Sequence, residues 1–127
     1  LGFKTVVPDV AFEHDPKYED AKRIIDSLIA TAKENNVEFG LKLTNTLESL
    51  NSTEKLPEDQ EMVYMSGRAL HPISINLAAK LQNDFDGVLD ISFSAGVDAF
   101  NVPEVLHCNI KPVTVCSDLL KPGGYTR

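Results

Sequence analysis

Small and hydrogen-bonding residues occupy four places where we expect strands to end. These places are residues 42–46, 64–68, 94–96 and 116–118. Ligands of parallel α/β proteins bind at the carboxyl ends of strands, and small residues there let backbone N–H groups approach an anion closely. Ser94-Ala95-Gly96 and Cys116-Ser117 are therefore candidates for a phosphate site. The alternative is that Gly96 only makes a tight turn.

Lys42 is a second candidate for ligand chemistry. It lies near the end of a segment in which Val37, Phe39, Leu41 and Leu43 alternate with polar or small residues, so its side chain belongs to the opposite face of the strand. A lysine there can neutralise a flavin ring anion or a phosphate. It can equally be a solvated lysine on an exposed sheet face.

Histidines and cysteines show no spacing typical of a metal or nucleophilic site. His14, His71 and His107 are far apart, and each lies next to a predicted helix end. Cys108 and Cys116 fit neither a disulfide framework nor a zinc ribbon. We predict no metal site, and the catalytic residues stay unassigned.

The elements that position these residues alternate between strands and helices. We predict strands at residues 3–7, 37–44, 62–65, 89–94 and 112–117, and helices at 16–34, 72–85 and 101–108. Residues 47–61 read as a long hydrophilic connection. Such an alternation implies an α/β fold with a mostly parallel sheet. A small doubly wound domain of flavodoxin-like size is a weaker reading, because strands buried on both faces are continuously apolar.

Three finer expectations concern the helices. Asp15 is a plausible N-cap with Pro16 at the first helical position. Ile73, Leu77 and Leu81 share one face of the second helix. Asn101 and Glu104 form a possible capping box for the third.

Composition limits the classes of function. The chain has 127 residues, 43% of them hydrophobic, which is enough for one core. Its net charge of −7 argues against nucleic acid as a partner. No run is long enough for a membrane span, and nothing at the N-terminus reads as a signal peptide, so we expect a cytoplasmic protein.

Several stretches together resemble a known group of enzymes. They are Asn45-Thr46, Met65 through Pro72, Ser94-Ala95-Gly96-Val97 and Val115-Cys116-Ser117. These stretches resemble the C-terminal half of the dihydroorotate dehydrogenase-like flavin barrels, which include the barrel domain of dihydropyrimidine dehydrogenase. Residues 40–48, 64–72 and 113–125 are also very similar to selenate reductase iron–sulfur/flavoprotein subunits. The resemblance covers roughly residues 37–127.

The resemblance implies that parallel βα units form the C-terminal half of a TIM-type (β/α)8 barrel with FMN at its C-terminal mouth. It places Asn45 and Thr46 near the substrate and flavin ring, and Ala95-Gly96 and Cys116-Ser117 around the FMN phosphate. Lys42, or Lys4 in its place, would contact the flavin. The cofactor-binding residues implied in this way are Lys42, Asn45, Thr46, Ser66, Gly67, Ala95, Gly96, Cys116 and Ser117.

The function implied by the resemblance is that of a multi-domain oxidoreductase. Electrons would pass between NAD(P)H, flavin, iron–sulfur clusters and a small-molecule substrate. Selenate is suggested only by name, and a purine- or pyrimidine-like compound fits equally. Two isolated cysteines cannot ligate a cluster, so any FAD, iron–sulfur cluster or NAD(P)H site belongs to other parts of the parent protein. The segment alone is expected to be inactive.

A second hypothesis is a catalytically silent barrel scaffold that keeps an anion seat at Gly96 and Ser117 and docks other domains or subunits. It is favoured by Val63-Tyr64, which stand where flavin barrels usually have a Gly-Gly pair. A whole barrel needs about 250 residues. We therefore expect residues 1–127 to be one segment of a larger protein, partnered by the rest of the parent chain or by self-association.

Overall fold

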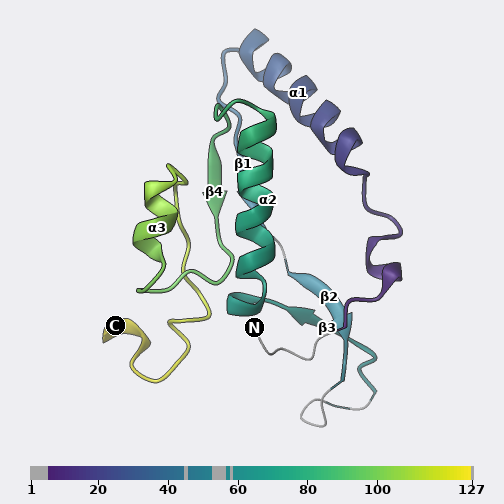
Figure 1. Cartoon of the computed structure of the whole chain (residues 1–127), viewed down its shortest axis with the longest axis vertical. Helices are drawn as coiled ribbons and strands as arrows, with labels where there is room; N and C mark the ends of the chain where they lie inside the picture. The colour runs from purple at the N-terminus through teal and green to yellow at the C-terminus, as the bar shows by residue number, and fades with distance from the viewer. Residues whose placement is uncertain (1–5, 45, 53–56, 58, 127) are drawn as a thin grey trace.

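The computed structural model describes residues 6–44, 46–52, 57 and 59–126. Its α-helices are α1 (Tyr18–Glu34), α2 (His71–Asp84) and α3 (Val102–His107), and its strands are β1 (Leu41–Leu43), β2 (Leu47–Leu50), β3 (Met62–Met65) and β4 (Ile91–Phe93) (Figure 1). Three 3-10 turns, η1 (Asp9–Phe12), η2 (Gly67–Ala69) and η3 (Gly124–Thr126), complete the order of elements. The alternation of strands and helices predicted for residues 16–108 is confirmed in outline.

Strands β1 and β4 are parallel neighbours, with Leu41 opposite Ile91 and Leu43 opposite Phe93. The segment after α3 runs along the other edge of β4, where Val113 forms a single parallel bridge with Phe93. The strand predicted at residues 112–117 is therefore reduced to one bridge. Its start at a proline explains part of this, because proline has no N–H to donate to a neighbouring strand.

Strands β2 and β3 form an antiparallel hairpin, which corrects two expectations. Leu47 lies opposite Met65 and Leu50 opposite Met62, so residues 62–65 do not join the parallel sheet. Residues 47–50 are a strand and not the start of a hydrophilic connection. The one buried residue of this strand is Ser49, which is 1% exposed and donates its hydroxyl to the Val63 carbonyl at 3.3 Å. A buried serine hides the pattern that a buried aliphatic would have revealed.

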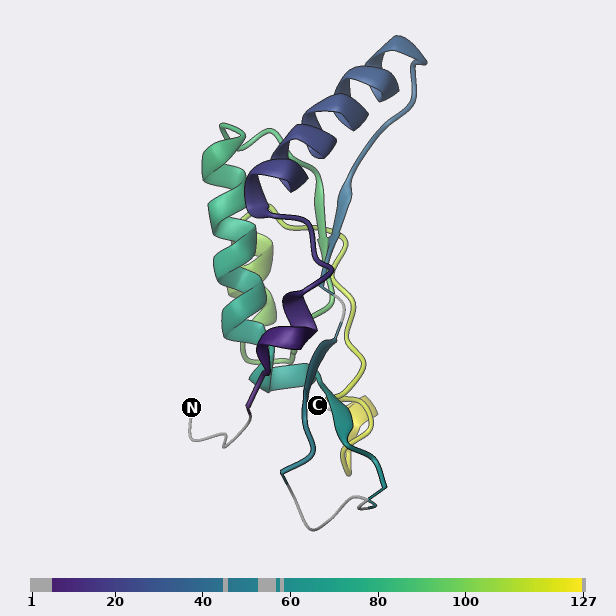
Figure 2. The same cartoon turned by 90° about the vertical axis from the view of Figure 1, so that its right-hand side faces the viewer.

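Helix α2 covers one face of β1 and β4, and Figure 2 places α3 on that same side. The buried residues of α2 are Ser74, Ala78 and Leu81, which recur at helical spacing. Ile73, predicted to share one face with Leu77 and Leu81, is 50% exposed, whereas Leu81 is buried. The small residues Ser74 and Ala78 bring the helix close to the sheet, and the Ser74 hydroxyl is hydrogen-bonded to Thr44 at 2.5 Å.

The predicted alternation of the strands is confirmed where β1 and β4 pair. Leu43, Ile91 and Phe93 are buried, whereas Lys42 is exposed and Ser92 is intermediate. One face of this sheet therefore supplies the core beneath α2. The other face carries the lysine and the serine.

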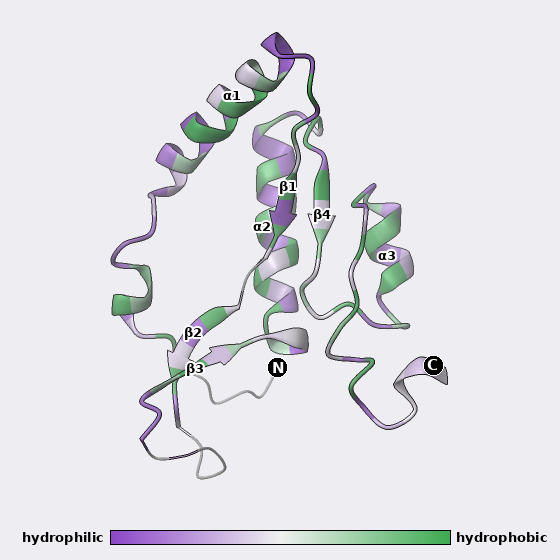
Figure 3. Cartoon of the chain, turned by 180° about the vertical axis from the view of Figure 1, so that it is seen from behind, coloured by the Kyte–Doolittle hydropathy of each residue, from purple (hydrophilic) through white to green (hydrophobic). Residues whose placement is uncertain are grey.

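Helix α1 begins at Tyr18, close to the predicted start, but its N-cap is Lys17 and not Asp15. It buries Ile25, while Ile24 and Leu28 stay 53% and 45% exposed. Figure 3 shows hydrophobic and hydrophilic residues alternating around this helix. Over the described residues, no helix combines the length and hydrophobicity that a membrane span requires. The strand predicted at residues 3–7 falls mainly outside the described residues.

Candidate functional site

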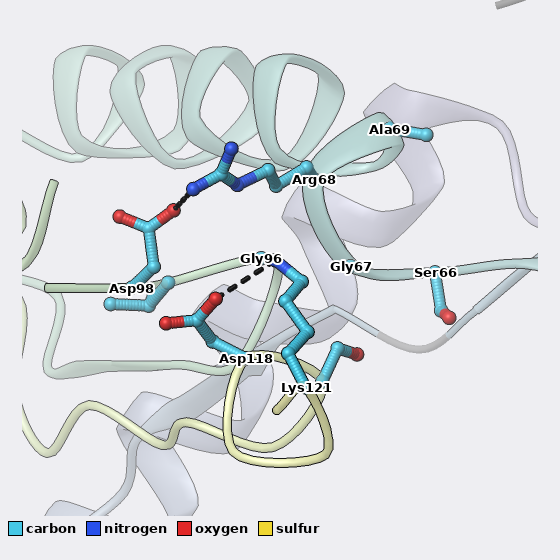
Figure 4. Close-up of a pocket in the computed structure, with 10 residues that line it drawn as sticks. Ser66, Gly67, Arg68, Ala69, Gly96, Asp98, Asp118 and Lys121 are labelled. Carbon is cyan, nitrogen blue, oxygen red and sulfur yellow. Dashed lines mark hydrogen bonds and ion pairs between the residues drawn. The ribbon is translucent and has the colours of Figure 1, made fainter. Parts of the chain in front are cut away.

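Three segments that are far apart in the sequence line one cavity of about 310 Å³ at the carboxyl end of β4. The first follows β3, the second follows β4, and the third follows the bridge at Val113. Its lining residues are Ser66, Gly67, Arg68, Ala69, Gly96, Val97, Asp98, Ser117, Asp118 and Lys121 (Figure 4). We call this cavity the strand-end pocket.

Gly96 joins the first two segments by backbone contact. A Cβ at this position would lie 2.3 Å from the Gly67 carbonyl oxygen and 2.8 Å from the Arg68 nitrogen. The φ of Gly96 is also +63°, in the left-handed region that favours glycine. The absence of a side chain at Gly96 thus lets the backbone pack against Gly67.

Gly67 has the same φ of +63°, and a Cβ there would lie 3.3 Å from the Ser117 hydroxyl. The first and third segments are therefore also in close proximity. The strand-end pocket depends on two glycines, each of which lets one segment approach another.

Arg68 and Asp98 form an ion pair across the pocket (Figure 4). Asp98 is 5% exposed, and its Oδ1 accepts the backbone N–H groups of Phe100 at 2.8 Å and Asn101 at 3.2 Å. Burial alone would raise the pKa of Asp98, but these N–H donors and the guanidinium outweigh it and lower the pKa below its usual range. Asp98 is consequently an ionised, fixed group that holds its own loop.

Asp118 and Lys121 form a second ion pair, with Nζ and Oδ1 2.8 Å apart. In Figure 4 Gly96 lies between the two pairs. The side chain of Asp118 is 8% exposed and that of Lys121 is 44% exposed. Two cations and two carboxylates therefore line the pocket, so its side chains sum to no net charge.

Two side chains hold the carbonyl groups just before and within the turn at Gly96. His71 Nδ1 is 2.7 Å from the Ala95 carbonyl oxygen, and Asn101 Nδ2 donates to the Gly96 carbonyl oxygen at 3.1 Å. Asn101 also accepts the Asp98 N–H through Oδ1 at 2.8 Å. Asn101 is the N-cap of α3 by position, but its side chain makes no cap hydrogen bond, so the expected capping box is wrong.

The structure brings four of the sequence-predicted site residues into the strand-end pocket, namely Ser66, Gly67, Gly96 and Ser117. Ala95 is buried and Cys116 is exposed, and neither lines the pocket, although each precedes a residue that does. Thr46 is exposed and does not line the pocket. Asn45 and Lys4 lie outside the described residues.

Lys42 lines a different cavity of about 320 Å³, on the sheet face opposite α2, together with Asp90, Ser92 and Lys111. It is therefore separated from the residues around Gly96. If Lys42 contacts a ligand, it does so from that other face of the sheet.

Sequence reasoning assigned no role to the four charged residues of the pocket, although Arg68 and Asp118 lie within the predicted strand ends and only Asp98 and Lys121 lie outside them. A signal existed for each, because Arg68 follows Ser66-Gly67 directly and the others come within four residues of a predicted strand-end residue. Their significance depends on pairing between segments, as with Arg68 and Asp98, which are 30 positions apart. Within the described residues no group of three or more His, Cys, Asp or Glu side chains could hold a metal ion.

Comparison with known proteins gives one family and two curated relatives. A family model described as "Oxidoreductase YgfK, N-terminal TIM-barrel domain" matches residues 1–127. The proteins named "Putative oxidoreductase YgfK" of Escherichia coli strain K12 and of Escherichia coli O157:H7 are each 47% identical over 117 residues. The match covers 92% of this chain but 11% of each relative, so the chain spans about a ninth of their length. No solved structure gives a significant match.

Proposed function

The chain belongs to the family of the N-terminal TIM-barrel domain of the oxidoreductase YgfK, and we propose that it supplies the seat for the phosphate of an FMN within that barrel. The observation that carries the proposal is the convergence of Gly67, Gly96 and Ser117 on one cavity. In many TIM barrels a phosphate binds between the loops that follow the last two strands. Here the loops after β4 and after Val113 line the strand-end pocket together.

The donors in the pocket suit a phosphate. Among the described residues, the backbone N–H groups of Gly96, Val97 and Ser117 have no protein acceptor. Arg68 and Lys121 add two cations, both of them partly exposed and able to turn from their carboxylates to a bound anion. Backbone N–H groups would therefore be the main donors to a bound phosphate, and the two cations would add positive charge.

The ring end of FMN has less support within this segment. Lys42 and Thr46, which the family resemblance assigns to the ring and substrate, do not line the strand-end pocket. Tyr64 on β3 is 70% exposed. The proposal therefore gives this segment the phosphate end and leaves much of the ring to other strands of the barrel. Bound FMN would supply hydride and single-electron transfer, and the residues named here would hold and orient it.

The wider proposal concerns a longer protein like the curated relatives, of whose length this chain spans about a ninth. We propose that residues 1–127 form half of a (β/α)8 barrel whose remaining strands lie elsewhere in that protein. Electrons would pass between NAD(P)H, flavin, iron–sulfur clusters and a small-molecule substrate, with a selenate reductase-like role as one reading. Self-association of the isolated segment stays an expectation based on its unpaired strand edges.

The silent scaffold is the second candidate, and two observations favour it. The charges of the strand-end pocket already neutralise one another, and Val63-Tyr64 fill a position where flavin barrels have glycine. In that case the pocket would hold loops together without a cofactor.

The two candidates differ in flavin binding by the full-length protein. We expect a titration with FMN, monitored by flavin absorption and fluorescence, to show saturable binding. Ser117→Asp should weaken it about tenfold or more, because it places a negative charge beside the phosphate. Lys121→Gln should weaken it by a smaller factor, and Lys33→Gln on the exposed side of α1 is the matched control. Absence of binding to the wild-type protein would favour the scaffold.

A further inference from the structure

Two side chains that do not line the strand-end pocket are hydrogen-bonded to carbonyl groups of the loop at Gly96. His71, the first residue of α2, contacts the Ala95 carbonyl oxygen through Nδ1 at 2.7 Å. Asn101, just before α3, donates Nδ2 to the Gly96 carbonyl oxygen at 3.1 Å. Two successive carbonyl groups are thus fixed by two different elements.

The contact at His71 has a defined polarity. A carbonyl oxygen only accepts hydrogen bonds, so Nδ1 of His71 carries the proton and donates it. The ring is also held by an edge-to-face contact with Phe93, whose centroid is 5.7 Å away at an interplanar angle of 84°. His71 is therefore a fixed donor directed at the peptide that joins Ala95 to Gly96.

Peptide geometry carries this restraint to the other side of the loop. Neither peptide bond of Gly96 is cis, and in a trans peptide the C=O and N–H groups point in opposite directions. Holding the Ala95 carbonyl toward His71 turns the Gly96 N–H away from α2. Holding the Gly96 carbonyl toward Asn101 turns the Val97 N–H away from Asn101.

Both N–H groups belong to residues that line the strand-end pocket. Neither has an acceptor among residues 6–44, 46–52, 57 and 59–126. Successive N–H groups around a residue with positive φ form a concave donor pair that suits an anion. The φ of +63° at Gly96 meets that condition.

We infer that His71 and Asn101 are positioning residues, which orient the N–H groups of Gly96 and Val97 as the seat of a phosphate or phosphomonoester dianion. The inference rests on the proposed phosphate site and assigns a role to a histidine that motif spacing left unexplained. Neither side chain touches the anion. Each acts through the peptide group whose carbonyl oxygen it holds.

The test separates the reach of the side chain from its mere presence. Asparagine at position 71 places an N–H at the same number of bonds from Cα as Nδ1, whereas the amide of glutamine lies one bond further out. His71→Asn should retain the donor to Ala95, and His71→Gln should lose it. The matched control is His107→Gln on α3, which is exposed and does not line the pocket.

The readout is binding of inorganic phosphate to the full-length protein, combined with hydrogen–deuterium exchange of the peptide that contains residues 94–101. Phosphate should slow exchange in the wild type, in His71→Asn and in His107→Gln. In His71→Gln the protection should be lost and the phosphate affinity should fall about tenfold. Because both variants at position 71 carry an amide, a purely structural role would affect them alike.

The outcomes separate this inference from the flavin proposal. Phosphate protection without FMN binding would overturn the flavin and leave the seat standing. Equal phosphate affinity in His71→Asn and His71→Gln would overturn the positioning role while the phosphate site stands. Failure of the wild type to bind phosphate, or protection confined to other peptides, would overturn the seat itself.

Discussion

Two carboxylates in this molecule have similar partners but different surroundings. Asp98 in the strand-end pocket and Asp84 at the end of α2 each pair with a cation, and each has a pKa below its usual value. Asp98 is 5% exposed and accepts two backbone N–H groups in addition to Arg68. The side chain of Asp84 is 20% exposed. Its partners in these contacts are the side chains of Tyr18, Lys22 and Lys80.

The difference between Asp98 and Asp84 is that the fold fixes the backbone donors of Asp98, whereas the donors of Asp84 are side chains. Backbone donors stay in place as long as the loop keeps its conformation, whereas each side-chain donor must be ordered at a cost in conformational entropy. The strand-end pocket is therefore preorganised by main-chain geometry. The Asp84 cluster is a clamp between α1 and α2, formed by Tyr18, Lys22, Lys80 and Asp84.

The largest expected effect comes from Gly96→Ala. Its Cβ would meet the Gly67 carbonyl at 2.3 Å, so the two segments must separate. We expect a loss of about 3 kcal/mol or more in the free energy of unfolding, and loss of phosphate binding. Urea denaturation of the full-length protein, monitored by hydrogen–deuterium exchange of the peptide that contains residues 94–101, measures the loss of stability.

Gly87→Ala is the matched control for that prediction. Gly87 also has a positive φ, of +73°, but nothing lies within 4 Å of its Cβ position. It should cost only about 1 kcal/mol, from backbone strain alone. Equal costs for the two substitutions would show that the contact between Gly96 and Gly67 contributes nothing.

The next effect is expected from Asp98→Asn, at about 2 kcal/mol near neutral pH, because a buried acceptor loses its charge beside Arg68. The lowered pKa of Asp98 means that its ionised form stabilises the folded state above the ordinary value of 3.8. That contribution is lost as the pH falls through the folded pKa. The difference in urea midpoint between wild type and Asp98→Asn should therefore shrink from about pH 5 downward. A difference that stays constant down to acid pH would contradict the ionised, paired state of Asp98.

Several elements could be predicted from the sequence because local patterns determine them. Pro72 marks the start of α2, and the turn at Asp86-Gly87 marks its end, where both residues adopt positive φ. The alternation of Leu89, Ile91 and Phe93 identified the strand that forms the centre of the core. These signals lie within one element and need no knowledge of its neighbours.

The failures have a shared physical reason, which is pairing between distant segments. In the hairpin of β2 and β3, the buried residue of β2 is Ser49, which lies opposite Val63 and carries no apolar signal in the sequence. Asn101 has the right type and spacing for a capping box, but its side chain is used by Gly96 and Asp98 instead. Likewise, small residues at strand ends indicated the pocket, while its ion pairs required the folded arrangement.

The smallest effect is expected at the clamp, from Tyr18→Phe. The hydroxyl donates to Asp84 Oδ2 at 3.0 Å in a partly exposed setting, so its removal should cost about 0.5 kcal/mol at neutral pH. Burial, and then the hydrogen bond and charge of Asp84, raise the pKa of Tyr18 from 10.0 to about 12. Above pH 10 the unfolded chain releases this proton while the folded chain retains it, so the stabilisation by Tyr18 declines until the folded group also ionises near pH 12.

The wild-type protein should consequently lose more stability than Tyr18→Phe between about pH 10 and pH 12. Both proteins keep Lys22 and Lys80, so deprotonation of the lysines affects them alike, and the difference between their urea midpoints isolates the tyrosine. A parallel pH dependence in the two proteins would mean that Tyr18 does not hold Asp84. The clamp would then consist of the lysines alone, and α1 would be joined to α2 by screened surface charge, in contrast to the fixed backbone donors around Asp98.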